Sequence, residues 1–306
     1  MFKTILLAGA CALAAGAVQA KDLKAVGVTV GSLGNPYFVA VGKGVTDAVK
    51  AAAPNAKVTV SSADYDLNKQ FTQIDNFISS GVDLILVNAA DPRAIGPAIK
   101  RAQAAGIVVV AVDVAAAGAD ATVQTNNTQA GEIACEYLAG KINNKGSVVI
   151  ENGPQVSAVI DRVNGCKSVL AKHPDIKLLS SDQDGKGSRD GGLNVMQGYL
   201  TRFPDLQGVF TINDPQAIGS DLAAKQLNRT GIVITSVDGA PDIVVALKGN
   251  TQVQASASQD PYTMGKLAVS TGVDIMNGKK PADPVILMES HLVTRDNVND
   301  YPGWSR

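Results

Sequence analysis

Three apolar runs in the chain each end on a polar side chain that could hydrogen-bond a small molecule. These side chains are Asp113, Asn213 and Asp238. Short runs rich in β-branched residues, placed between helical segments, are typical of strands buried on both faces of a parallel sheet. In such sheets, ligands bind in the crevice beyond the carboxyl ends of the strands. The pattern therefore predicts a binding site that contains two carboxylates and one amide.

A further candidate segment, Asn35-Pro36-Tyr37-Phe38, follows the first predicted strand. Pro36 suits the first turn of a helix, where its missing N–H costs no hydrogen bond, and Asn35 could cap that helix. Two adjacent aromatic residues on a helix face different directions, so it is hard to place both in one core. At the carboxyl end of a strand they could instead lie against the C–H face of a sugar ring.

Strand-like and helix-like segments alternate from Lys24 almost to the end of the chain. We expect strands near residues 25–32, 57–62, 83–88, 107–113, 146–151, 176–181, 207–213, 231–237, 252–257 and 284–288. The amphipathic stretches between them include residues 39–53, 68–80, 94–105 and 128–141. This alternation predicts an α/β fold of right-handed βαβ units, with helices on both faces of parallel sheets. About ten strands are too many for one compact sheet, so we expect two Rossmann-like lobes.

The two lobes are expected to be joined by a three-strand hinge. The turn-rich segment Asn126-Asn127-Thr128 is the expected first crossover, and the others fall near residues 259–261 and 289–292. The N-terminal lobe would then contain residues 21–125 plus 260–289, and the C-terminal lobe residues 126–259 plus 290–306.

The first 20 residues predict export. They begin Met-Phe-Lys3, continue with a short apolar run and end Val18-Gln19-Ala20, as in a secretory signal peptide cleaved after Ala20. A membrane-spanning helix needs about 20 apolar residues, which is longer than this run. Lipid attachment at Cys11 is an alternative, although the small residues before it lack the usual bulky side chain. We therefore expect a soluble, exported protein.

The remaining composition excludes several classes of site. The net charge is -1 with both signs scattered, which gives no nucleic-acid or membrane-surface footprint. Cys135 and Cys166, each on a predicted helix, fit no short metal-ligand spacing, and two histidines are too few to complete a zinc site. In an oxidising compartment these cysteines are expected to form a disulfide, with two buried free thiols as the alternative. We expect no metal and no cofactor.

Taken together, several spaced motifs resemble those of periplasmic ribose-binding-type proteins, the sugar-receptor branch of the type I periplasmic binding fold. The resemblance covers essentially the whole mature chain. It rests on Asn35-Pro-Tyr-Phe38, Val112-Asp113, Ile160-Asp-Arg162-Val-Asn-Gly165, Gly192-Leu-Asn-Val-Met-Gln197, Ile212-Asn213-Asp214, Val237-Asp238-Gly239 and Ser258-Gln259. It implies a non-enzymatic receptor whose two lobes close around a sugar, as the solute-binding component of an ABC sugar transporter.

The resemblance also implies roles for individual residues. Hydroxyls of the ligand would be bound by carboxylates, amides and a guanidinium, and the sugar ring would pack on aromatic side chains. The residues carried over by position are Asn35, Tyr37, Phe38, Asp113, Arg162, Asn213, Asp238 and, at the hinge, Gln259. As alternatives, Asp113 and Asp238 could cap loops, and Arg162 could pair with Asp161 on the surface. Asp64, Asn88 and Asn152 are secondary candidates that are equally well explained as turn or cap residues.

Two departures from the family pattern bear on the ligand. Val114 stands where ribose receptors carry an arginine, and Gly187 lies near the expected position of a second-lobe aromatic. The extra space could admit a larger hexose, an inositol or an open-chain polyol. The expected ligand is thus a neutral pentose, hexose, inositol or alditol. We expect a monomer that serves a membrane permease, with a chemoreceptor as a further potential partner. A repressor core and a sugar-modifying enzyme are the alternatives from other classes. The only tryptophan, Trp304, is near the C-terminus and is expected to be a poor fluorescent reporter.

Overall fold

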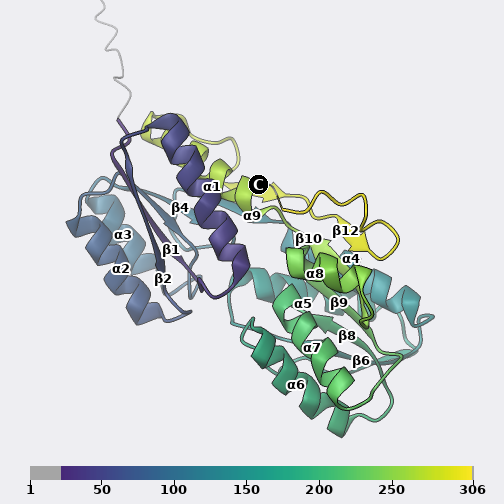
Figure 1. The fold of residues 1–306 in the computed structure, drawn as a ribbon. Helices are drawn as coiled ribbons and strands as arrows, with labels where there is room; N and C mark the ends of the chain where they lie inside the picture. Colours follow the sequence, from purple (N-terminus) through teal and green to yellow (C-terminus); the bar gives the residue numbers. More distant parts are fainter. Residues whose placement is uncertain (1–21, 305–306) are drawn as a thin grey trace, which may run out of the picture.

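The computed structural model describes residues 22–304 of the chain. The expected signal peptide, residues 1–20, and Cys11 within it lie outside the described residues. Two α/β lobes lie end to end and are joined by several passages of the chain (Figure 1). Among the described residues, no helix combines the length and apolarity needed to cross a membrane.

The first lobe is built on a six-stranded parallel sheet with the order β11-β5-β4-β3-β1-β2. Its strands are β1 (Ala25–Val30), β2 (Lys57–Ser62), β3 (Leu84–Val87), β4 (Val108–Val112), β5 (Ala121–Thr125) and β11 (Val285–Met288). One face is covered by α1 (Pro36–Ala52) and α9 (Pro261–Met276). The other face is covered by α2 (Leu67–Ser79) and α3 (Gly96–Ala104).

The second lobe repeats this plan around a sheet with the order β12-β10-β9-β8-β6-β7. Its strands are β6 (Gly146–Glu151), β7 (Ile176–Ser180), β8 (Leu206–Thr211), β9 (Val233–Asp238), β10 (Val253–Ser258) and β12 (Leu292–Thr294), the last antiparallel to β10. One face is covered by α4 (Asn127–Lys141) and α5 (Ser157–Leu170). The other face is covered by α6 (Arg189–Arg202), α7 (Asp214–Gln226) and α8 (Pro241–Lys248).

The near-continuous apolar strands follow from this layered packing. In β4, Val109 and Ala111 join the core under α2 and α3, whereas Val110 and Val112 join the core under α1 and α9. Successive side chains of a strand point to opposite faces, so a strand covered on both sides needs apolar residues at every position. The predicted α/β fold with two parallel-dominated lobes is therefore confirmed.

Two strands were missing from the sequence-based prediction. β5 has the sequence Ala-Thr-Val-Gln-Thr, and its polar residues interrupt the apolar run by which a buried strand is recognised. β12 has only three residues and lies at the sheet edge. Short strands of this kind are stabilised by their neighbours rather than by their own pattern.

The described chain passes between the two sheets after β5, after β10 and between β11 and β12. These passages support our proposed lobe boundaries, with residues 21–125 plus 260–289 in one lobe and 126–259 plus 290–306 in the other. One contact departs from that division, because Trp304 packs against the α1–α9 core of the first lobe.

Helices α4 and α5 are held unusually close together. A Cβ atom at Gly131 would clash with the backbone oxygen of Arg162, and one at Gly165 would clash with that of Thr128. Only glycine permits this approach without a shift of backbone. The structure also contains a disulfide between Cys135 of α4 and Cys166 of α5.

A buried carboxyl group lies at the end of β6. Glu151 is fully buried, and its Oε1 accepts a hydrogen bond of 2.8 Å from Ser220 Oγ, while its Oε2 has no partner. Burial raises the pKa of Glu151 to about 8, so that the folded protein keeps this group protonated near neutral pH.

We expect Glu151→Gln to flatten the pH dependence of stability. A folded-state pKa raised above the ordinary 4.5 gives a contribution that is fully present below that pH and is lost as the pH rises to about 8. The wild-type free energy of unfolding should therefore fall by roughly 3–5 kcal/mol over this range because of Glu151, and urea titrations at pH 5 and 8 measure it. The exposed control Asp205→Asn should leave the slope unchanged. An equally steep slope in Glu151→Gln would contradict this assignment.

Candidate functional site

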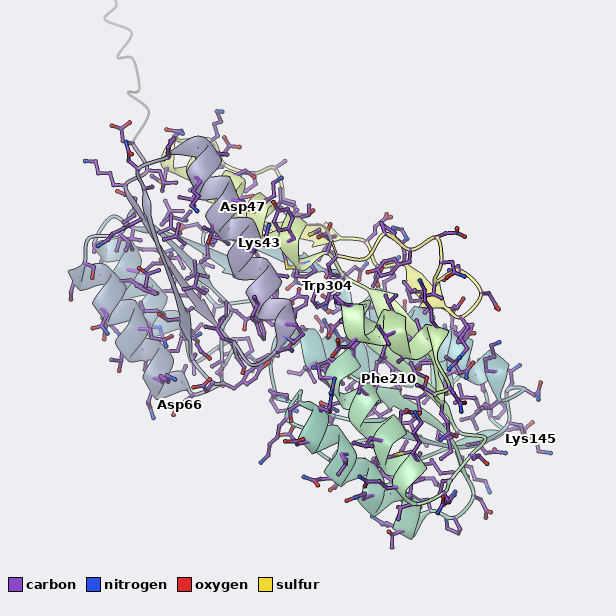
Figure 2. All side chains as sticks on the ribbon, viewed as in Figure 1. Lys43, Asp47, Asp66, Lys145, Phe210 and Trp304 are labelled. Atoms are coloured by element: carbon purple, nitrogen blue, oxygen red, sulfur yellow. A yellow bond between two sulfur atoms is a disulfide. The ribbon has the colours of Figure 1, made fainter. Side chains whose placement is uncertain are left out.

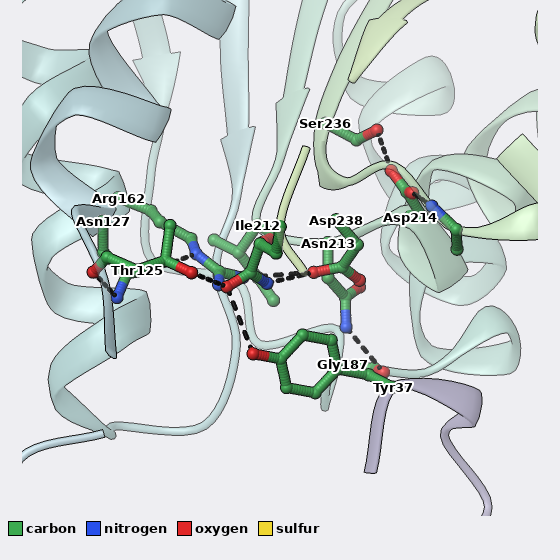
Figure 3. A network of polar contacts seen from close by, with 12 residues as sticks. Tyr37, Thr125, Asn127, Arg162, Gly187, Ile212, Asn213, Asp214, Ser236 and Asp238 are labelled. Atoms are coloured by element: carbon green, nitrogen blue, oxygen red, sulfur yellow. Dashed lines mark hydrogen bonds and ion pairs between the residues drawn. The ribbon is translucent and has the colours of Figure 1, made fainter. Parts of the chain in front are cut away.

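A cavity of about 40 Å³ lies between the lobes, at the carboxyl ends of the strands. All eight primary residues predicted from the sequence line it: Asn35, Tyr37, Phe38, Asp113, Arg162, Asn213, Asp238 and Gln259. Figure 3 shows Tyr37 of the first lobe together with Arg162, Asn213 and Asp238 of the second. The structure therefore brings these side chains together in one place, although their role in binding stays a prediction.

Asp113 directly follows β4 in a left-handed backbone conformation, with φ 70°. Its Oδ1 accepts a hydrogen bond of 2.7 Å from the Tyr37 hydroxyl, and its Oδ2 accepts one of 2.8 Å from Asn88 Nδ2. A left-handed conformation is costly for a residue other than glycine and is often found at functional sites. The carboxylate bonds side chains rather than capping its own loop, which argues against the alternative considered for it.

Arg162 projects from α5 and is buried. Its Nε donates to Asn127 Oδ1 at 2.8 Å, and its Nη1 donates to the Ile212 carbonyl oxygen at 2.9 Å. The same Nη1 lies 3.7 Å from Asp238 Oδ1, which makes an ion pair. Pairing with Asp161 on the surface, the alternative considered above, is not what the structure shows.

Gln259 connects the two lobes through its side-chain amide. Its Nε2 donates to Asp238 Oδ1 at 2.7 Å, and its Oε1 accepts from Thr125 Oγ1 at 2.6 Å and from the Tyr37 hydroxyl at 3.3 Å. Because Thr125 and Tyr37 belong to the first lobe and Asp238 to the second, this amide lies in a hydrogen-bond chain that spans the cleft.

Burial sets the electrostatics of the site. It raises the pKa of Asp238 to about 6, against the opposing effect of the Arg162 guanidinium. It also raises the pKa of Asp113, where Arg162 and the hydrogen bond from Tyr37 act in the opposite direction. The pKa of the Tyr37 hydroxyl is raised well above its usual value by burial and by Asp113, so this hydroxyl remains a donor. The site thus offers two carboxylates and one guanidinium shielded from water.

Two of the asparagines that line the cavity, Asn35 and Asn213, are also helix caps. Asn35 Oδ1 accepts from the Tyr37 backbone N–H at 3.0 Å, and Asn213 Oδ1 accepts from the Gln216 N–H at 3.1 Å. Asn213 Nδ2 donates to the Gly187 carbonyl at 3.0 Å (Figure 3). Both side chains line the cavity, but part of their hydrogen-bonding capacity is used by the protein itself.

The secondary candidates separate into two groups. Asn88 lines the cavity and supports Asp113. Asp64 does not line it, since its carboxylate is exposed and bonded to Ser62 and Lys69. Asn152 does not line it either, because its side chain braces a loop through the Ser181 carbonyl and the Gly153 N–H.

Sequence reasoning missed two aromatic residues at the site. Tyr65 lines the cavity directly. Trp304 lies at the seam of the lobes (Figure 2), with its ring 5.8 Å from that of Tyr37 and its Nε1 donating to the Asp238 carbonyl oxygen at 2.8 Å. Sequence reasoning noted only that Trp304 is near the C-terminus and did not foresee these contacts. Tyr65 could have been found, because it directly follows Asp64 at the end of a predicted strand, whereas nothing local marks Trp304.

The arrangement is suited to recognition by hydrogen bonding. Carboxylates accept from hydroxyl groups, the guanidinium donates in a planar fork, and Phe38 and Tyr37 supply apolar ring surface. Among residues 22–304, no cluster of three or more His, Cys, Asp or Glu side chains is arranged to hold a metal ion.

Comparisons with known proteins agree with this geometry. The chain matches the family described as "Periplasmic binding protein domain" over residues 26–280. It is 33% identical over 261 residues to a ribose import binding protein of Bacillus subtilis, covering 83% of this chain and 82% of the relative. It is also 33% identical over 283 residues to a xylitol-binding protein of Mycolicibacterium smegmatis, covering 91% and 79%.

A solved structure shows the same fold. An ABC transporter solute-binding protein from Mycobacterium smegmatis, crystallised with bound glycerol, superposes with a TM-score of 0.85 at 26% identity. The superposition covers 93% of this chain and 98% of that one. The chain therefore belongs to the periplasmic binding protein family, and its relatives support the ribose-type sugar-receptor branch within that family.

Proposed function

We propose that this protein is a periplasmic receptor that captures a neutral sugar or polyol between its lobes and delivers it to the permease of an ABC transporter. The observation that carries the proposal is the meeting of Asp113 from one lobe with Arg162 and Asp238 from the other, around one buried cavity. The candidate ligands are a pentose, a hexose, an inositol or an alditol.

The charges of the site favour a neutral ligand. An anion would face two carboxylates, and a cation would face the Arg162 guanidinium. A polyhydroxy compound instead places donors and acceptors on adjacent carbons, which suits this mixture. Hydrogen bonds to charged groups contribute about 1.5–3 kcal/mol each, so a few of them support micromolar binding after the cost of ordering. The ribose, xylitol and glycerol named for the relatives are all of this class.

Ligand entry requires the lobes to separate. The residues that line this small cavity come from both lobes, and Asp113, Arg162 and Asp238 among them are buried. A sugar would first contact one lobe of an open form, and closure about the hinge would add the contacts of the other lobe. The permease would recognise the closed shape through surfaces of both lobes.

Several further aspects belong to the same proposal. The N-terminal segment would direct export to the periplasm, and the protein would act as a monomer without catalysing a reaction. A chemoreceptor is a second partner that the same closed form could serve.

A thermal-shift screen against pentoses, hexoses, inositols and alditols tests the proposal. A ligand that binds only the native state raises the melting temperature, by an amount that grows with its concentration relative to its Kd. At least one neutral polyol should produce a saturable shift and be recovered unchanged after incubation. If no member of these classes shifted the melting temperature, or if the compound were chemically altered, the proposal would fail.

Asp238→Ala should weaken binding of the compound found in that screen by about 2–3 kcal/mol, or roughly 30–150-fold, because ligand hydroxyls and Arg162 lose their anion. Calorimetric titration measures the change. Asp205→Ala is the control, since its carboxylate is exposed and lies outside the cleft, and it should bind within about twofold of wild type. Wild-type affinity in Asp238→Ala would remove Asp238 from the binding site.

Ligand affinity should also fall in acid. The pKa of Asp238 is about 6 and that of Asp113 is raised as well, and a protonated carboxyl is a poorer acceptor for hydroxyls. If only the ionised form of Asp238 binds, affinity at pH 5 should be about tenfold lower than at pH 8. Calorimetry at the two pH values checks this, with Asp238→Asn as the variant that should lose most of the dependence. Equal wild-type affinities at both pH values would contradict the assignment.

A further inference from the structure

Two spaces meet at the mouth of the cleft. Next to the cavity of about 40 Å³ lies a larger pocket of about 460 Å³, which opens outward between the same two lobes. Among residues 22–304, three line both spaces: Asn35, Tyr65 and Gly187. These residues therefore form the boundary between the inner cavity and the outer pocket, and Tyr65 is the only one of them with a large side chain.

The backbone fixes the position of Tyr65. Asp64 and Tyr65 are consecutive residues in the left-handed region, with φ values of 54° and 58°. The Tyr65 N–H donates to the Gly31 carbonyl oxygen at 3.1 Å, and the next residue, Asp66, caps α2 through hydrogen bonds to the N–H groups of Asn68 and Lys69. A tight turn anchored at both ends therefore directs this side chain into the cleft.

The ring of Tyr65 is packed on two sides. A Cβ atom at Gly31 would lie 2.7 Å from Tyr65 Cε1, so the ring rests on a backbone position that only glycine leaves free. The ring also meets Phe38 edge to face, with centroids 6.4 Å apart and planes at 69°. Phe38 is itself a cavity residue, so the two aromatic side chains form one continuous wall.

The hydroxyl end of Tyr65 reaches toward the opposite lobe. The Tyr65 hydroxyl oxygen would lie 3.8 Å from a Cβ atom placed at Gly187. Gly187 is near the position where the family pattern has an aromatic residue of the second lobe. No hydrogen bond is formed by this hydroxyl among the described residues. Burial and the nearby carboxylates of Asp113 and Asp238 raise its pKa, so it stays a neutral donor. An unused donor thus faces the place where a ligand would sit.

We propose that Tyr65 sets the upper size limit of the ligand: its ring closes the inner cavity against the outer pocket, and its hydroxyl donates to the bound compound. This inference rests on the proposed function, because it assigns selectivity within the same site. Tyr65 would supply from the first lobe the wall that Gly187 leaves open on the second. The protein would accept single-ring sugars or short alditols and exclude disaccharides, whose second ring would need the outer pocket.

The test compares wild type, Tyr65→Phe and Tyr65→Ala by calorimetry. The small probes are D-ribose, D-allose, xylitol and myo-inositol, and the large probes are maltose, lactose, trehalose and melibiose. Tyr65→Phe should keep the size limit and weaken the best small probe by about 2–12-fold, from the loss of one hydrogen bond. Tyr65→Ala should weaken it further and raise affinity for at least one disaccharide by about tenfold or more relative to wild type.

Tyr262→Ala is the matched control. Tyr262 lies outside both spaces, and its hydroxyl is bonded to Asp47 at 3.0 Å. This variant should leave both affinity and size selectivity as in wild type. Circular dichroism and melting temperature establish that each variant is folded.

The outcomes separate the two proposals. If wild type binds none of the small probes nor any other neutral polyol, the proposed function itself fails. If wild type binds a small probe but Tyr65→Phe matches wild type and Tyr65→Ala still rejects every disaccharide, the function stands and the role of Tyr65 is overturned. Disaccharide binding by wild type would equally overturn the size limit.

Discussion

The rest of the structure depends on one buried guanidinium that acts on two carboxylates from opposite lobes. Arg162 lies 3.7 Å from Asp238, and burial raises the pKa of both Asp238 and Asp113 against its influence. Taking such charges out of water is costly unless each is hydrogen-bonded. The surrounding polar groups serve that purpose, through Asn127 for Arg162 and Gln259 for Asp238. The fold thus supplies the hydrogen-bond partners that offset the free-energy cost of burying these three charged groups.

The scaffold holds the cluster from two directions. Parallel strands place Asp113 and Asp238 just beyond or at their carboxyl ends, both with positive φ. Arg162 comes instead from a helix, and its position depends on how closely α5 approaches α4. Gly131 contacts the backbone of Arg162 itself, and the disulfide joins the same helix pair. Gly131 and the disulfide, which do not line the cavity, therefore help to position the Arg162 guanidinium.

The sequence was most informative where local pattern and tertiary role coincide. Apolar runs ending on Asp113, Asn213 and Asp238 predicted strand ends at one edge, because strands buried on both faces cannot hide polar residues elsewhere. Strands β5 and β12 were missed because their pairing partners, rather than their composition, define them. The cap role of Asn35 was foreseen, whereas the seam position of Trp304 depends on a long-range contact that no local pattern encodes. Tyr65 was partly predictable. It lies next to a strand end that the sequence indicates, but its direction depends on a turn with two consecutive positive φ values.

The place of the Trp304 indole has a consequence for the resting state of the molecule. The indole ring packs edge to face with Tyr37 of the first lobe, and its Nε1–H donates to the Asp238 carbonyl oxygen of the second. Pulling the lobes apart breaks one of these attachments, so the tail adds to the closed population even in a vacant receptor. The closed form is also the form that would hold the ligand, so the same contact favours the liganded state and raises affinity as long as the empty receptor is mostly open. The two contacts of Trp304 are therefore one contribution to the balance between open and closed forms.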